Sequence, residues 1–190
     1  DLSFTPEQDA FRLRLRQWLA AHLPPGWAED TPPITDYEEE VAFLHQWQQT
    51  LYAGGWCGLT WPKAYGGQGA GLIEQVIYNE EMARAQAPEL INKVGINNVG
   101  PTLILHGTDA QKRRYLAPIL SGEEIWCQLF SEPGAGSDLA SLRTRAERDG
   151  DGYRLSGQKV WTSYAEFSRW AICLARTDPD APKHKGITYC

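Results

Sequence analysis

The chain has 190 residues, of which 42% are hydrophobic and 22% charged, and its formal net charge is −6. This is an ordinary soluble globular composition, and no stretch approaches the ~18 consecutive apolar residues that a membrane span needs. The acidic balance argues against nucleic-acid binding, because phosphate backbones are held by clustered Lys and Arg. The first residues lack the basic region and apolar stretch of a secretory signal peptide, so we expect a cytoplasmic protein.

The first two-thirds of the chain carries helical patterns. Thr5-Pro6-Glu7-Gln8 is typical of a capping box with proline at the first helical position, and it predicts a helix to about His22. Pro24-Pro25-Gly26 should stop that helix. Asp36 can cap a second helix, with a stripe from Val41 to Leu51, that ends at Gly54-Gly55.

A glycine- and tryptophan-rich connection, 56–69, follows and is predicted to be an ordered loop lying against a core. Further helices are then predicted from three apolar or capping patterns. They are a helix marked by Leu72, Ile73, Val76, Ile77 and Ala83, a short helix Pro101–His106, and a helix from the capping box Thr108–Gln111 to Ser121-Gly122.

Beyond Gly122 the pattern changes to strands, which predicts two domains, 1–121 and 122–190. Asp149-Gly150-Asp151-Gly152 is a strong hairpin turn. The strand candidates are 125–130, 143–148, 153–156, 160–161, 170–175 and 186–190. The predicted fold class is α+β, with an all-α N-terminal domain followed by an antiparallel, β-barrel-like domain. The sheet is left with an unfinished edge, so the chain is expected to be truncated at its C-terminus.

The most informative stretch runs from Cys127 to Asp138, where an apolar strand-like run breaks into a loop containing Gly134 and Gly136. Such a loop brings backbone N–H groups to the surface among hydroxyls and can hold a polar ring or a phosphate. Glu132 and Asp138 flank its Pro-Gly turn, and we favour a role in capping the loop over a role as paired catalytic carboxylates.

Several other kinds of site are not supported. The four histidines lack metal-ligand spacing and the four cysteines are scattered, so neither a metal site nor a disulfide framework is predicted. The glycines between Gly66 and Gly71 are not followed by Gly-Lys-Ser/Thr, and no G-x-G-x-x-G lies between a strand and a helix. A P-loop or a Rossmann unit is therefore not expected.

Four segments together resemble the acyl-CoA dehydrogenases: 61–67, 78–81, 129–138 and 157–163. The resemblance covers essentially the whole chain and implies the family's N-terminal helical domain and the first part of its middle β-domain, without the C-terminal helical domain. It implies FAD-dependent α,β-desaturation of an acyl-CoA thioester, in which a carboxylate removes the α proton and a hydride passes to flavin N5. In this family the base is a glutamate of the C-terminal domain, so no catalytic residue is named in this chain.

The resemblance also implies site residues. The flavin-binding set is Gln128, Leu129, Phe130, Ser131, Gly136, Ser137, Trp161, Thr162 and Ser163. Ser131 matches a side-chain donor to the flavin's pyrimidine edge, and Ser137 would also contact the acyl-CoA. Trp161 matches the aromatic residue that covers one flavin face, although taken alone it would be interpreted as a core or sheet residue. Asn97 to Gly100 is expected near the acyl pocket.

Two positions depart from the family pattern at the end of the second motif. Many members carry threonine where this chain has Ser163, and asparagine where it has Tyr164. The hydroxyl survives the first change, whereas the bulk of Tyr164 is expected to alter the local loop.

The partners implied are an acyl-CoA substrate and an electron-transfer flavoprotein, in a homo-oligomer (dimer or tetramer) or a hetero-oligomer, within fatty acid β-oxidation. The alternatives are an acyl-CoA oxidase, nitroalkane oxidase or flavin monooxygenase of the same fold, or a non-catalytic subunit of a hetero-oligomeric dehydrogenase. These residues do not determine the acyl chain length, nor whether the substrate is a steroid or a fatty acyl group.

Overall fold

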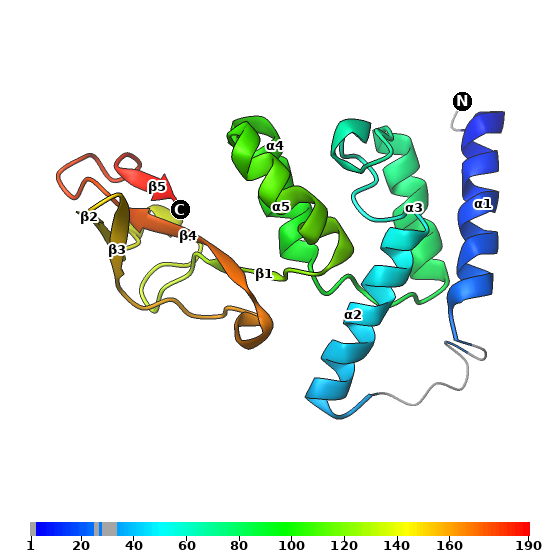
Figure 1. Cartoon of the computed structure of the whole chain (residues 1–190), viewed down its shortest axis with the longest axis horizontal. Coiled ribbons are helices and arrows are strands. Elements are labelled where there is room, and N and C mark those ends of the chain that lie inside the picture. The colour runs from blue at the N-terminus through cyan, green and yellow to red at the C-terminus, as the bar shows by residue number, and fades with distance from the viewer. Residues whose placement is uncertain (1–2, 25–26, 28–33) are drawn as a thin grey trace. The chain divides into compact units, whose positions relative to one another are not determined.

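The computed structural model describes residues 3–24, 27 and 34–190. The chain divides between Glu123 and Glu124 into two compact units, the first helical and the second containing the strands (Figure 1). The helices of the first unit are α1 (Pro6–His22), α2 (Tyr37–Ala53), α3 (Leu72–Arg84), α4 (Gly100–His106) and α5 (Asp109–Ser121). The strands of the second unit are β1 (Trp126–Leu129), β2 (Arg145–Asp149), β3 (Gly152–Ser156), β4 (Trp170–Arg176) and β5 (Ile187–Tyr189).

Local capping residues begin and end the helices where the sequence predicts. The Thr5 hydroxyl accepts from the Gln8 amide over 3.3 Å, and Gln8 Oε1 accepts from the Thr5 amide over 3.0 Å, which completes the capping box of α1. Asp36 caps α2 through the Glu39 amide, and Gly122 ends α5 with a φ of 76°, a left-handed conformation that glycine adopts without strain. Of the predicted stop after α1, Pro25 and Gly26 lie outside the described residues.

The helix α3 is confirmed, but its buried side chains coincide only in part with the apolar residues that predict it. Leu72, Ile73 and Val76 are exposed, and the side chains that α3 buries belong to Ile77, Tyr78 and Glu81. Figure 1 shows α3 beside α1, and Arg12 and Arg16 of α1 both reach Glu81. The ion pairs with Arg12 and Arg16 therefore allow the carboxylate of Glu81 to be buried, which a pattern of apolar residues does not predict.

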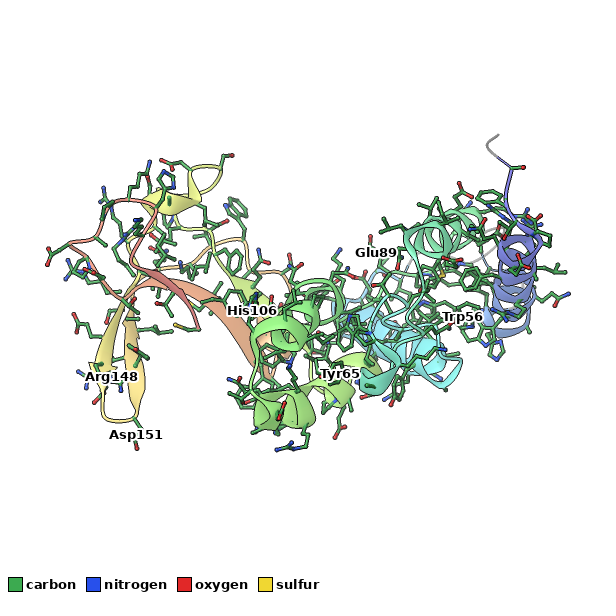
Figure 2. All side chains as sticks on the ribbon, turned by 90° about the horizontal axis from the view of Figure 1, so that it is seen from above. Trp56, Tyr65, Glu89, His106, Arg148 and Asp151 are labelled. Carbon is green, nitrogen blue, oxygen red and sulfur yellow. The ribbon has the colours of Figure 1, made fainter. Side chains whose placement is uncertain are left out.

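The segment 56–69 is an ordered loop, as predicted. Its Trp56, Cys57, Leu59 and Trp61 side chains are buried, and Trp61 Nε1 donates to the Ile96 carbonyl oxygen over 3.1 Å. Trp56 lies within the helical unit, with its ring 5.6 Å from that of Phe11 on α1 (Figure 2). Ahead of α4, residues Gly95–Val99 form a short π-helix that the sequence did not predict.

The second unit contains a mixed sheet with the strand order β1-β4-β2-β3, and β5 pairs with β4. The α+β class is confirmed, but the antiparallel, barrel-like description needs correction, because β4 runs parallel to both β1 and β2. Only β2–β3 and β4–β5 are antiparallel. The strands described do not close into a barrel, since β1 and β3 are the ends of the strand order.

The predicted hairpin is confirmed, whereas one predicted strand is wrong. Asp149 pairs with Gly152 across the β2–β3 turn, and Asp151 lies at its tip (Figure 2). Val160 and Trp161 lie in a loop, because Trp161 has a φ of 61° and strand residues need a strongly negative φ. None of the helices in the described part of the chain is long and apolar enough to cross a membrane.

Candidate functional site

The glycine-containing loop follows β1 directly. Gln128 and Leu129 are the last residues of β1, and Phe130 and Ser131 come immediately after it, all of them half-buried. Glu132 and Ala135 exchange two backbone hydrogen bonds of 2.8 and 3.1 Å, which closes a tight turn. Beyond the turn, Gly136 and Ser137 are exposed. A Cβ atom at Gly134 or Gly136 would meet nothing within 4 Å, so the backbone here is open to an approaching ligand.

A backbone hydrogen bond joins the two sequence motifs. The Val160 amide donates to the Ser131 carbonyl oxygen over 3.0 Å, which places Trp161 one residue from that contact. The structure thus brings the end of β1 together with the second motif. Within the described residues, the Ser131 hydroxyl has no hydrogen-bond partner.

The second motif presents its side chains to solvent. The Trp161 side chain is 90% exposed, Ser163 is exposed and Thr162 is half-buried. Positive φ values are uncommon for bulky residues, yet Trp161 and Tyr164 have φ angles of 61° and 59°. Asparagine tolerates this left-handed conformation better than tyrosine does, so the backbone at Tyr164 has a conformation that its own side chain does not favour.

A buried ion pair lies beneath the two motifs. Lys159 Nζ lies 2.9 Å from Glu132 Oε1, and both side chains are 8% exposed. Lys159 also donates to the carbonyl oxygens of Phe130 and Leu174, over 3.0 and 2.8 Å. The sequence did not predict a role for Lys159. The only signal that could have suggested this ion pair is that Glu132 and Lys159 belong to the two motifs of the candidate site.

The Glu132 carboxylate is fully engaged in holding the loop. It accepts hydrogen bonds from the Arg143 amide, the Thr144 amide and the Thr144 hydroxyl, over 2.6, 2.8 and 2.6 Å. Burial alone would raise the pKa of Glu132, but the hydrogen bonds from Thr144, Arg143 and Lys159 together lower that pKa to about 2. Glu132 is therefore charged at neutral pH, and its hydrogen bonds to the loop confirm the loop-capping interpretation.

Asp138 also anchors the loop, but its side chain is exposed. It accepts a 2.6 Å hydrogen bond from the Ser141 hydroxyl and forms a 2.6 Å ion pair with Lys183. The contact with Lys183, followed by that with Ser141, lowers the pKa of Asp138. Glu132 and Asp138 are thus separate loop anchors and not an acid/base pair.

The first unit contains a hollow at the segment that was expected near the acyl pocket. Its volume is about 220 Å³, and its lining includes Trp61, Tyr78, Asn79, Asn97 and Pro101. Gly100 lies against Trp61, since a Cβ atom at this glycine would come 1.8 Å from the indole. Among the described residues, no group of His, Cys, Asp or Glu side chains could hold a metal ion.

Comparisons with known proteins place these features in one family. The sequence model of the acyl-CoA dehydrogenase N-terminal domain matches residues 5–123, and that of the acyl-CoA dehydrogenase middle domain matches residues 127–190. The chain therefore belongs to the acyl-CoA dehydrogenase family.

Individual relatives agree with this assignment. Acyl-CoA dehydrogenase IpdE1 of Mycobacterium tuberculosis is 45% identical over 183 residues, which are 95% of this chain and 48% of that protein. The solved structure of the Tcur3481-Tcur3483 steroid ACAD is 38% identical with a TM-score of 0.82, and the match covers 100% of this chain and 48% of that one. The ChsE4-ChsE5 complex from Mycobacterium tuberculosis is also 38% identical, with a TM-score of 0.80 and coverage of 100% and 47%. The chain thus spans about half the length of these relatives.

Proposed function

We propose that this chain is the N-terminal and middle part of an FAD-dependent acyl-CoA dehydrogenase that introduces an α,β double bond into an acyl-CoA thioester. The observation that carries the proposal is the pairing of Ser131 with the segment of Trp161, through the hydrogen bond from Val160. This pairing joins the segment that carries the free Ser131 hydroxyl to the segment that carries the Trp161 indole, which is 90% exposed. A flavin needs both a flat apolar surface for its ring and hydrogen-bond donors for its pyrimidine edge, so the residues present fit the cofactor.

The residues of the second unit divide the work of holding the cofactor. In this proposal Gln128, Leu129, Phe130 and Ser131 line the pyrimidine edge, and the Ser131 hydroxyl donates to it. Trp161 covers one face of the ring and excludes water, while Thr162 and Ser163 lie at its N5 end. Gly136 and Ser137 leave the loop open at the point where Ser137 would contact the acyl-CoA. When bound, FAD supplies the hydride acceptor.

Proton abstraction needs a carboxylate that is free to accept a proton, and two candidates in this chain are occupied. Arg12 and Arg16 hold Glu81, and Thr144, Arg143 and Lys159 hold Glu132. We therefore propose that the base belongs to the C-terminal helical domain of the complete protein, and that an electron-transfer flavoprotein reoxidises the flavin.

We further propose that the complete protein works in a hetero-oligomer and accepts a bulky, steroid-derived acyl group. Support comes from the 38% identity over the whole chain to both the Tcur3481-Tcur3483 steroid ACAD and the ChsE4-ChsE5 complex. A homo-oligomer acting on straight-chain fatty acyl-CoA is the alternative, and a substrate panel separates the two.

The test uses the complete protein, whose oligomeric state and any co-purifying chain are first determined by mass measurement. Straight-chain and steroid-side-chain acyl-CoA thioesters are added without oxygen, and flavin absorbance is followed before and after air is admitted. Bleaching that recovers slowly in air supports the dehydrogenase. Rapid peroxide formation favours an oxidase, and purified protein without flavin favours a non-catalytic subunit.

A further inference from the structure

We infer that Lys159 is a positioning residue for the flavin site, because its ammonium group contacts both chain neighbours of Ser131, the backbone of Phe130 and the carboxylate of Glu132. The inference rests on the proposed function, and it adds a residue that neither the sequence motifs nor the family resemblance assigned to the site. Three observations carry it: the contacts of Lys159, the anchoring of Glu132 and the position of Val160.

The contacts of Lys159 bracket Ser131. An ammonium group has three donors, and those of Lys159 go to Phe130 O, Glu132 Oε1 and Leu174 O at 3.0, 2.9 and 2.8 Å. Phe130 and Glu132 are the two chain neighbours of Ser131. Since Leu174 belongs to β4, Lys159 ties both neighbours to the sheet.

Glu132 transmits this restraint to a third segment. Its oxygens accept from the amides of Arg143 and Thr144 and from the Thr144 hydroxyl, just ahead of β2. The carboxylate thus cannot swing away without breaking several short hydrogen bonds. Lys159 and Glu132 are each 8% exposed, so water offers little compensation for a lost contact.

Val160, the residue after Lys159, contacts Ser131 itself. Val160 donates its amide to the Ser131 carbonyl oxygen, so Lys159 and Val160 together contact residues 130, 131 and 132. Trp161 follows with a positive φ that the chain does not favour on its own. The contacts of Lys159 and Val160 therefore fix the positions of both the Ser131 hydroxyl and the Trp161 indole, although neither of these side chains takes part in the contacts.

The test compares three variants of the complete protein. Lys159→Met keeps the length of the side chain but leaves the buried Glu132 without its counter-charge, so it is expected to destabilise the protein. The double variant Glu132→Gln/Lys159→Met removes both charges and should recover most of the stability. Arg154→Met, which breaks only the exposed pair with Asp149 in the β2–β3 hairpin, is the matched control.

Two readouts separate positioning from simple charge balance. In the apoprotein, hydrogen exchange at the Val160 amide should be faster in the double variant than in wild type, because Phe130 and Leu174 have lost their donor. In the holoprotein, the double variant should bind FAD roughly tenfold more weakly and show a shifted flavin absorption band, while Arg154→Met behaves like wild type. A double variant with wild-type exchange, FAD affinity and spectrum would overturn the inference. A wild-type protein that binds no FAD would instead overturn the proposed function, and the exchange measurement would still test whether Lys159 orders residues 130–132.

Discussion

Gly157 packs against Thr144 so closely that a Cβ atom on the glycine would lie 2.3 Å from Thr144 Oγ1 and 2.7 Å from its Cα. Because one of these atoms is backbone, no rotation of the Thr144 side chain relieves the clash. Thr144 in turn donates its amide and its hydroxyl to Glu132. The close approach therefore supports the loop that carries Ser131.

Gly157→Ala should destabilise the protein by about 1–3 kcal/mol, the usual cost of forcing extra volume into a packed site. Urea unfolding followed by circular dichroism measures the change. Gly134→Ala is the control, since a Cβ atom there meets nothing within 4 Å. Equal midpoints for Gly157→Ala and wild type would contradict the packing described.

Ser131→Ala should weaken FAD binding without unfolding the apoprotein. The Ser131 hydroxyl has no partner among the described residues, so its removal leaves no protein group unsatisfied. One hydrogen bond contributes about 1 kcal/mol, which corresponds to roughly fivefold in the dissociation constant. Flavin fluorescence titration of the complete protein measures it, with the exposed Ser156→Ala as control. Unchanged affinity would remove Ser131 from the proposed site.

Trp161→Ala should lower flavin retention while thermal stability of the apoprotein stays close to wild type. A side chain that is 90% exposed contributes little to the core, but an aromatic contact with the flavin ring would contribute about 0.5–1.5 kcal/mol. The measurement is the FAD content after gel filtration together with the melting temperature of the apoprotein. A large loss of apoprotein stability with normal FAD content would show that the indole packs within the protein.

Helix ends could be predicted from the sequence because they depend on residues three or four positions apart. The capping boxes of Thr5 and Thr108, and Gly122 after α5, are of this local kind. The burial of Glu81 on α3 could not be predicted, because its partners Arg12 and Arg16 lie 69 and 65 residues earlier in the chain. The mixture of parallel and antiparallel pairs in the sheet likewise depends on which strands lie next to β4, and the residue pattern of a strand does not identify its neighbours.

The same distinction between local and distant determinants applies to the candidate site. The open loop at Gly134 and Gly136 could be predicted, since proline and glycines mark a turn wherever they occur. The strand expected at Trp161 was wrong because its φ of 61° lies outside the strand region, and the residue pattern does not reveal that angle. The contacts of Lys159 could not be predicted because a lysine is normally exposed, and its acceptors at Phe130, Glu132 and Leu174 lie 15 to 29 residues away in the chain.

The burial and ion pairing of the Glu81 carboxylate predict that the protein loses stability in acid. It is 2% exposed and accepts from Arg12 Nη1 over 2.9 Å and from Arg16 Nε and Nη2, both over 2.8 Å. The hydrogen bond from Arg16 is the main cause that lowers the pKa of Glu81 to about 2, and Arg12 adds to it. A depressed folded-state pKa gives stability that is complete above the ordinary glutamate pKa of 4.5 and is lost as the pH falls from there toward 2.

Glu81→Gln should therefore destabilise the protein at pH 7 by about 3 kcal/mol, because it leaves the two arginines without their buried counter-charge. The variant should also lose less of its remaining stability between pH 4.5 and 2 than wild type does, since the group that titrates there is gone. Urea midpoints measured across this range give both quantities. Glu89→Gln is the matched control, because its pair with Lys93 is exposed and such pairs contribute about 0–1 kcal/mol. If Glu81→Gln and Glu89→Gln had the same effect at pH 7, the buried ion pairs between α1 and α3 would not stabilise the helical unit as described.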